Sequence, residues 1–204
     1  MLKKQMSSMR RSQGVTLIEM MIALVIGLIV SGAALALVVA VMKSNADTIR
    51  ATRLTQELRT TAEIIARDLR RARSVSDPIA NVGKTPLLNA CNTISPAATA
   101  SASCVTFGYD CDTATSGSFK AVGLAGGKVR LLTATAGAPA CPSTSTGTQL
   151  SSDVVTINSL TITALNADAY TIRVVGRFTN DPSTTSPLIR SFTQEVRIRS
   201  AAVN

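Results

Sequence analysis

The first quarter of the chain carries a long run of apolar residues. From Met20 to Met42 the sequence has 23 residues and no charged side chain. As a helix rising about 1.5 Å per residue, this run would reach about 34 Å, enough for the hydrocarbon core of a membrane, which is roughly 30 Å thick. The pattern predicts a hydrophobic helix that can span a membrane.

A helical pattern continues beyond this run, but it becomes amphipathic. Apolar residues recur every three or four positions at Leu54, Leu58, Ala62, Ile65, Leu69 and Ala72. No proline or glycine interrupts residues 33–77, and Asp77-Pro78 is a natural helix stop. We predict one helix over residues 16–74, whose second half packs its apolar stripe against a sheet.

The remainder of the chain has the pattern of strands separated by loops. Residues 75–150 are rich in loop-forming residues, and the C-terminal part alternates between apolar and polar positions like a half-buried sheet. Short strands are predicted at Val105–Tyr109, Lys128–Thr133, Asp153–Asn158 and Leu160–Leu165. A β-rich region is therefore expected after the helix.

Two longer strands near the C-terminus are predicted to form an antiparallel hairpin. Their inward positions are Tyr170, Ile172, Val174, Phe178, Phe192, Val196 and Ile198, and their outward positions include Arg173, Arg177, Glu195, Arg197 and Arg199. Pairing about a loop centred near residue 184 would set Arg173 opposite Glu195 and Ile172 opposite Val196. The outward arginines could contact the phosphates of DNA, although a solvated strand face is the simpler interpretation.

Together these elements predict an α+β fold. One long N-terminal helix, with a membrane half and an amphipathic half, packs on an antiparallel β-sheet. The predicted organisation is a leader over residues 1–14, a hydrophobic transmembrane helix over 15–42, its amphipathic continuation over 43–76, and a disulfide-stapled β-rich head over 77–204.

Basic residues are concentrated at two places in this chain of net charge +9. The leader contains Lys3, Lys4, Arg10 and Arg11 and no acid, so the positive-inside rule keeps it cytoplasmic. Residues 43–73 hold eight basic against four acidic side chains. Such a helix could meet anionic lipid or nucleic acid, but a solvated face with ion pairs between subunits is the favoured interpretation.

Four cysteines, Cys91, Cys104, Cys111 and Cys141, lie in the part predicted to be outside the cytoplasm. An even number in an oxidising compartment predicts two disulfides, and four cysteines allow three connectivities. We expect Cys91–Cys104 and Cys111–Cys141, because these pairs close the shorter separate loops. Histidine and Cys-x-x-Cys spacing are both absent, so no metal site is expected.

One carboxylate, Glu19, lies at the entrance of the apolar run, shortly after Gly14. An unpaired carboxylate is costly there and indicates a function. A cut after Gly14 would create an α-amine on Val15, one helical turn from Glu19. Pairing of Glu19 with the amine of a neighbouring subunit would be a heterologous contact, the kind that generates helical filaments. The alternative is that Glu19 only reaches the lipid headgroups.

The segment Gly14 to Leu24, GVTLIEMMIAL, resembles the type III signal of prepilins, the subunits of type IV pili and type II secretion pseudopili. The resemblance implies that a prepilin peptidase cuts the Gly14–Val15 bond and methylates the new terminus at Val15, where the family usually has phenylalanine. It also implies that Glu19 guides assembly.

The same resemblance implies the surroundings of the protein. The chain would cross the bacterial inner membrane once, with its N-terminus in the cytoplasm and its head in the periplasm and later in the fibre. Its partners would be other minor and major pilins and the inner-membrane assembly platform, and no cofactor is implied.

Within this family, the stretches Met21–Gly32 and Ala66–Ala72 are similar to the PilW group of minor type IV pilins. The second stretch, ARDLRRA, also resembles the J-type minor pseudopilin of type II secretion, which remains the alternative. Major pilins usually have a disulfide-bounded loop near the C-terminus, whereas here the last cysteine is Cys141. The resemblance thus implies a minor pilin in the complex that initiates assembly and lies at the fibre tip.

Other interpretations of the apolar run fit less well. Ala34-Leu35-Ala36 could end a secretory signal peptide, but the apolar core of such peptides is only about 7–15 residues long. A plain single-pass anchor explains the length but neither Gly14 nor Glu19, and a buried core helix is not expected at this length. An enzyme is not expected either, because histidine and a nucleophile motif are absent.

Overall fold

The computed structural model describes residues 14–77, 79, 93–97, 99–111, 117–135, 137–181 and 187–199. The chain divides into two compact units, Met1–Thr48 and Ile49–Asn204. Helix α1, Leu17–Arg70, begins in the first unit and ends in the second. Residues 1–13 of the leader, Cys91, Pro78 and most of the hairpin loop near residue 184 lie outside the described residues.

Helix α1 is continuous over 54 residues, as the sequence predicts, but it ends earlier than expected. The backbone N–H groups of Arg71 and Ala72 bond to carbonyls three residues before them, and Arg73 has a φ of 63°. A tightened last turn followed by a left-handed residue is a common helix end. The stop at Asp77-Pro78 was therefore predicted too late, because tertiary contacts end the helix first.

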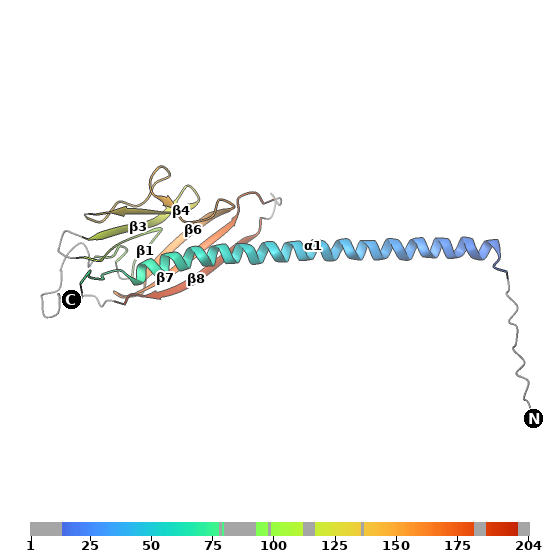
Figure 1. Ribbon diagram of the computed structural model, residues 1–204, viewed down its shortest axis with the longest axis horizontal. Coiled ribbons are helices and arrows are strands. Elements are labelled where there is room, and N and C mark those ends of the chain that lie inside the picture. Colours follow the sequence, from blue (N-terminus) through green and yellow to red (C-terminus); the bar gives the residue numbers. More distant parts are fainter. Residues whose placement is uncertain are drawn as a thin grey trace, which may run out of the picture. The chain divides into compact units, whose positions relative to one another are not determined.

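The second unit contains two antiparallel sheets (Figure 1). One has the order β1-β6-β7-β8 and the other β2-β3-β4-β5. The strands of the first are Ser101–Ala102, Val155–Ala164, Ala169–Phe178 and Ile189–Arg197; those of the second are Cys104–Tyr109, Ser118–Ala125, Lys128–Ala134 and Thr148–Gln149. The predicted fold class is confirmed, with two sheets in place of one.

Two of the predicted strands are a single strand. Residues of Asp153–Asn158 and Leu160–Leu165 form β6, whose pairing with β7 shifts between Ile157 and Ser159. A bulge inserts one residue and turns the following side chains to the opposite face. The alternation therefore breaks there, although the strand does not.

For the hairpin of β7 and β8, the sequence predicted the faces of the side chains correctly but the register of the pairing wrongly. Arg173 lies opposite Thr193, and Ile172 lies opposite Gln194. The partners are two residues away from the predicted ones. A shift of two leaves each side chain on its face, so the apolar pattern alone could not detect the error.

The hairpin of β3 and β4 contains a strand that the sequence analysis missed. The two strands meet at Ala125 and Lys128, leaving Gly126 and Gly127 as a two-residue turn. Both glycines have positive φ, at 60° and 72°. Such turns match the twist of a hairpin and strongly favour glycine. The Gly126-Gly127 pair was therefore the signal for β3.

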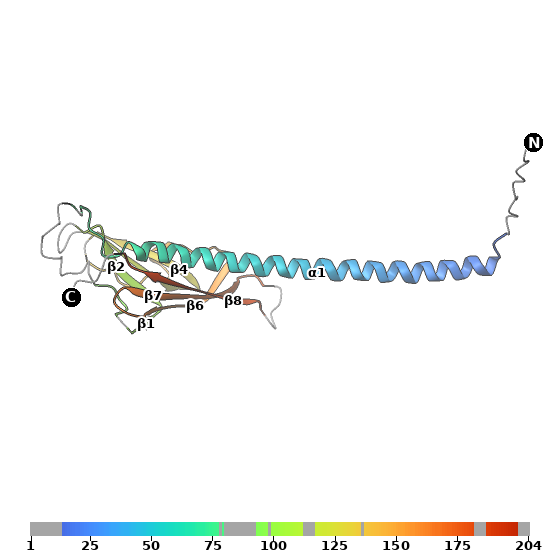
Figure 2. The same ribbon diagram turned by 90° about the horizontal axis from the view of Figure 1, so that it is seen from below.

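The apolar stripe of α1 forms the centre of the core. Leu54, Leu58, Ala62, Ile65, Leu69 and Ala72 are all 0% exposed. They belong to one cluster that includes buried residues of both sheets. Figures 1 and 2 show this half of the helix lying along β7 and β8. A Cβ on Gly176 of β7 would lie 2.9 Å from Leu58 Cδ2, so the close approach of helix and strand requires glycine there.

Polar contacts fix the end of α1 to both sheets. Asp68 accepts a 2.8 Å bond from Lys120 of β3, and Arg73 forms a 2.6 Å ion pair with Asp168 just before β7. The N–H of Arg73 also bonds to the carbonyl of Gly108 in β2 at 2.8 Å. Burial raises the pKa of the neighbouring Tyr170 hydroxyl, with a smaller lowering by Arg73.

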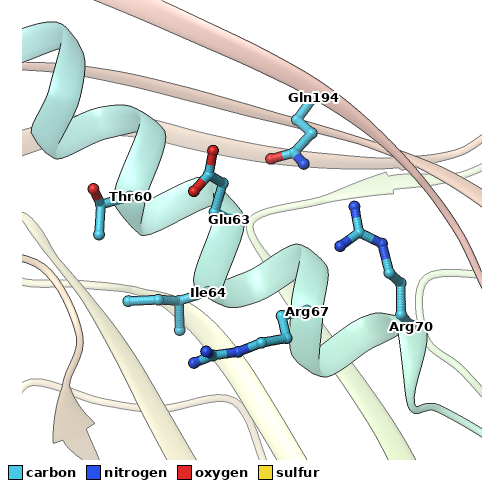
Figure 3. Close-up of a pocket in the computed structure, with 6 residues that line it drawn as sticks. All are labelled: Thr60, Glu63, Ile64, Arg67, Arg70 and Gln194. Carbon is cyan, nitrogen blue, oxygen red and sulfur yellow. The ribbon is translucent and has the colours of Figure 1, made fainter.

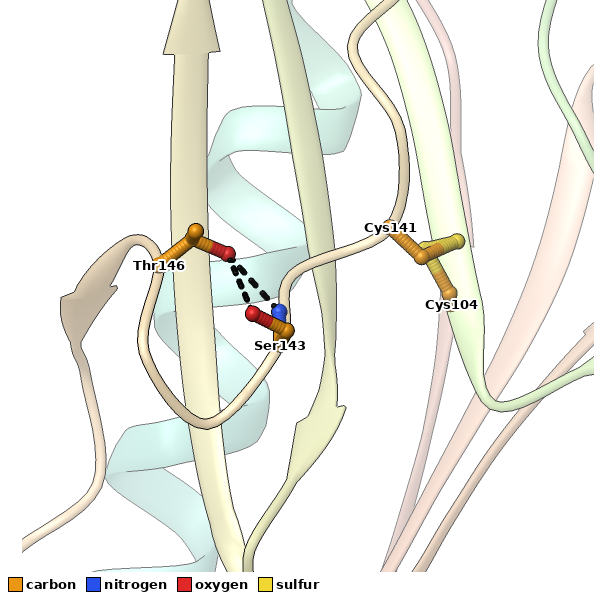
Figure 4. Close-up of a disulfide and its surroundings, with 4 residues drawn as sticks. All are labelled: Cys104, Cys141, Ser143 and Thr146. Carbon is orange, nitrogen blue, oxygen red and sulfur yellow. Dashed lines mark hydrogen bonds between the residues drawn. A yellow bond between two sulfur atoms is a disulfide. The ribbon is translucent and has the colours of Figure 1, made fainter.

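The predicted disulfide pairing is wrong. Cys104, at the start of β2, is bonded to Cys141 (Figure 4). Cys111 is also disulfide-bonded, and Cys91 lies outside the described residues. Loop length misled the prediction, because the sheet decides which cysteines meet. Gly123 of β3 pairs with Cys104, and its missing side chain lets Pro142 lie over the strand beside the disulfide.

Candidate assembly site

The site predicted from Gly14, Val15 and Glu19 lies at the start of α1. The helix begins at Leu17, and Thr16 is its N-cap. The Glu19 N–H bonds to Thr16 Oγ1 at 3.3 Å, and the Met20 N–H bonds to the Thr16 carbonyl at 3.2 Å. A threonine at this position satisfies N–H groups that have no partner within the helix.

Thr16 was missed by the sequence analysis. Its signal was the spacing Thr-x-x-Glu directly before an apolar run, the pattern of a capping box. The threonine half of that pattern is present in the structure. Thr16 therefore fixes the residue at which the helix begins, and with it the place of Glu19 in the first turn.

Val15 lies before the N-cap, so it is not part of the helix. The prediction that positions 15 and 19 lie one helical turn apart on the same face is therefore wrong for this structure. Gly14, Val15 and Thr16 have no regular secondary structure and are exposed. The Gly14–Val15 bond therefore lies outside the helix, in exposed backbone.

Glu19 is an acidic residue in the first turn of α1 and is exposed. The partial positive charge at a helix N-terminus favours a carboxylate at this position. Among the described residues, Glu19 forms no side-chain ion pair or hydrogen bond. Its carboxylate oxygens are therefore available to a group outside this chain.

The first half of α1 is apolar and exposed. Its most apolar window of 18 residues has a mean hydropathy of 2.8, and none of that window is buried inside the structure. Large side chains such as Leu17 and Leu28 are 79% and 69% exposed. By length and composition this helix can cross a membrane. An apolar surface of this size requires lipid or other protein to cover it.

The other predicted residues do not gather into a second site. Arg173, Arg177, Arg197 and Arg199 are exposed. On the paired strands, Arg177 lies opposite Ile189 whereas Arg197 lies opposite Ala169, so these arginines are spread along the sheet. In the parts of the chain that the structure describes, no group of three or more His, Cys, Asp or Glu residues could hold a metal ion.

Two family models match this chain. Residues 9–35 match the prokaryotic N-terminal methylation motif, and residues 47–198 match prepilin peptidase-dependent protein B. The first match includes Gly14, Val15 and Glu19, and the second includes the amphipathic half of α1 and both sheets.

Comparisons with curated proteins and solved structures add little to these matches. No curated protein matches the chain. Among solved structures, a type IV-like pilin from Thermus thermophilus is 11% identical, with a TM-score of 0.42. The match covers 72% of this chain and 97% of that one.

Proposed function

This chain belongs to the prepilin peptidase-dependent protein B family, and we propose that it is a minor pilin of the PilW group that helps to initiate type IV pilus assembly. The family consists of pilin-like structural proteins and not of enzymes. The prepilin resemblance of the N-terminal segment is confirmed by the methylation motif over residues 9–35. A pilin of this kind is processed by prepilin peptidase and associates with other pilins.

The first step of the proposed function is cleavage of the Gly14–Val15 bond, followed by methylation of the new amine on Val15. The position of this bond supports the proposal. One residue, Val15, separates it from the N-cap Thr16, and it lies in exposed backbone without regular structure. A peptidase can therefore bind the bond without unwinding α1, because the helix begins after it.

The second step is pairing of Glu19 with the amine of a neighbouring subunit. The observation that carries this proposal is the exposed carboxylate of Glu19 at the tip of an otherwise apolar helix. In a bundle of such helices the carboxylate would lie in a medium of low dielectric constant, where an unpaired charge is strongly disfavoured. The Val15 amine of another subunit supplies the opposite charge. This head-to-tail contact does not close on itself and therefore extends a filament.

The choice between a minor pilin and a minor pseudopilin of type II secretion depends on features outside the stretch Ala66–Ala72. Asp68 bonds to Lys120, and Arg71 bonds to Asp110 at 2.8 Å. These contacts show that the charged residues of the stretch hold the helix against the head. A pilin and a pseudopilin would both need such contacts, so the stretch does not distinguish them. We retain the pilus assignment from the Met21–Gly32 resemblance. Neighbouring genes would separate the two classes.

The proposed location follows from the charges and the disulfide. The basic leader stays in the cytoplasm, α1 crosses the inner membrane, and the head lies in the periplasm. The Cys104–Cys141 bond supports this orientation, because disulfides persist in oxidising compartments. The assembly platform of the inner membrane is the expected partner before the subunit enters the fibre. We do not extend the proposal to DNA.

The intact mass of the protein purified from membranes tests the processing step. We expect a chain that starts at Val15 and carries one added methyl group. A chain that still starts at Met1 would contradict the proposal. A chain that starts near Leu37 would instead identify an exported protein with an ordinary signal peptide.

A further inference from the structure

Strand β8 forms an open edge of its sheet. It is the last strand in the order β1-β6-β7-β8, and Figure 1 shows it at the outer margin of that sheet. The Ile198 N–H bonds to the Asp168 carbonyl on the β7 side, whereas the Arg199 N–H bonds to the Arg70 carbonyl on the other side. Backbone groups alternate in direction along a strand. Those of Ser191, Thr193 and Glu195 therefore point away from β7.

These outward backbone groups have no partner in the described part of the chain. Unpaired N–H and C=O groups in a row are a template for another strand. Among the residues that the structure describes, the backbone of α1 bonds to this edge at Arg199. A stretch of three outward-facing residues, from Ser191 to Glu195, remains open to pairing.

Two hollows lie along the junction of α1 and β8, which we call the α1–β8 seam. One, shown in Figure 3, has a volume of about 440 Å³ and is lined by Thr60, Glu63, Ile64, Arg67, Arg70 and Gln194. The other has a volume of about 380 Å³ and is lined by Ala51, Thr52, Thr55, Gln56, Arg59 and Arg190. The open edge of β8 is thus next to a groove with room for the side chains of another strand.

The seam carries uncompensated positive charge. Arg59 is neutralised by Glu63 at 2.7 Å. By contrast, Arg67, Arg70 and Arg190 form no ion pair or hydrogen bond through their side chains with any described residue. Guanidinium groups bind carboxylates well because two parallel N–H groups can meet both oxygens. A carboxylate from another molecule would therefore complement the charge of this seam.

Gln194 of β8 contributes a polar side chain to the wall of the seam. Its Oε1 atom is buried and has no hydrogen-bond partner among the described residues. A buried acceptor without a donor costs free energy, and such groups are rare in finished structures. In Figure 3 the Gln194 side chain points toward the side of α1 that bears Glu63 and Arg70. The wall of the seam thus contains an unsatisfied polar atom as well as unpaired arginines.

We propose that β8 pairs with an extended strand of another pilin subunit, which places acidic side chains over Arg67 and Arg70. The backbone of the added strand would bond to the outward groups of Ser191, Thr193 and Glu195. Its side chains on the α1 side would enter the seam. The inference rests on the proposed function for the class of the partner. It does not rest on it for the site, because all the residues of the seam belong to this chain.

Peptide binding to the full-length chain in detergent tests the proposal. The probe is a fluorescent peptide of about ten residues, a typical strand length, with alternating valine and glutamate. One control peptide carries N-methyl groups on alternate backbone nitrogens, which prevents strand pairing. Another has lysine in place of glutamate. We expect the first peptide to bind by fluorescence anisotropy and both controls to lose binding.

Two matched double variants distinguish binding at the seam from general electrostatic attraction to the protein. Arg67→Glu with Arg70→Glu should weaken binding roughly tenfold, because attraction becomes repulsion at two positions. Arg173→Glu with Arg177→Glu makes the same change of charge on the opposite face of the sheet and should leave binding unchanged. Equal loss in both double variants would overturn the proposal.

Three further outcomes would also overturn it. They are no binding of the acidic peptide, equal binding of the N-methylated peptide, and displacement of the peptide by short duplex DNA or anionic vesicles. The last outcome would assign the seam to nucleic acid or to a lipid surface. None of these results depends on cleavage at Gly14, so failure of the proposed function would be seen separately, in the intact mass.

Discussion

The two halves of α1 use apolar residues in opposite ways. In residues 17–48 every side chain is exposed, including Leu24 at 68%. In residues 54–70 most apolar side chains lie on one buried stripe, and Leu54, Leu58 and Ile65 are 0% exposed. The first half is apolar on all sides, whereas the second half is polar on the side away from the sheets.

The difference shows which interactions the chain completes by itself. The second half is covered by its own sheets and is fixed by the ion pairs of Asp68 and Arg73. The first half has no such cover in the described chain, and up to Met42 it carries one carboxylate, Glu19, among apolar residues. Its environment must come from outside, first from lipid and then from the helices of other subunits.

Truncating a leucine should have the largest difference in effect on stability between the two halves. Leu58→Ala leaves a cavity between α1 and β7, and we expect the free energy of unfolding to fall by about 2–5 kcal/mol. Leu24→Ala makes the same chemical change on an exposed surface and should change it by less than about 0.5 kcal/mol. Urea unfolding of both full-length variants in detergent, followed by circular dichroism of the head, measures the difference. Equal losses would mean that the halves do not differ as described.

A smaller effect is expected from adding one methyl group to a glycine. A Cβ on Gly176 would lie 2.9 Å from Leu58 Cδ2 and 3.0 Å from the Thr156 carbonyl oxygen. Gly176→Ala should therefore destabilise the head by about 1–3 kcal/mol through overpacking.

The matched control for this change is Gly27→Ala, because nothing lies within 4 Å of a Cβ at Gly27. We expect no shift in the urea midpoint of the head for Gly27→Ala. A normal midpoint for Gly176→Ala would show that the helix and β7 can move apart at little cost.

The structural features that the sequence predicted are those that a local pattern of residues determines. The continuous helix, its buried stripe and the faces of β7 and β8 follow from periodicities that each segment carries within itself. The position of Glu19 was also found, because a single acid before an apolar run stands out. Thr16 was missed although its capping pattern is local, so that error was avoidable.

Other features depend on contacts between distant segments. The Cys104–Cys141 bond, the end of α1 at Arg70 and the register of β8 are all set by how the sheets pack. The seam depends on Gln194 lying beside Arg67 and Arg70, which are more than a hundred residues earlier in the chain. No periodicity in either segment indicates that these residues lie close together. Such sites become visible only when the fold is known.

The central claim is that Glu19 pairs with another subunit, and its incorporation into fibres tests this most directly. Glu19→Ala should still be cleaved at Gly14, but its amount in sheared pili relative to membranes should fall roughly tenfold or more, since a buried amine would lose its partner. Glu57→Ala removes a carboxylate from the head half of the same helix that does not line the α1–β8 seam, and it should be incorporated normally. Quantitative mass spectrometry of both fractions gives the ratios. Normal incorporation of Glu19→Ala would contradict the account.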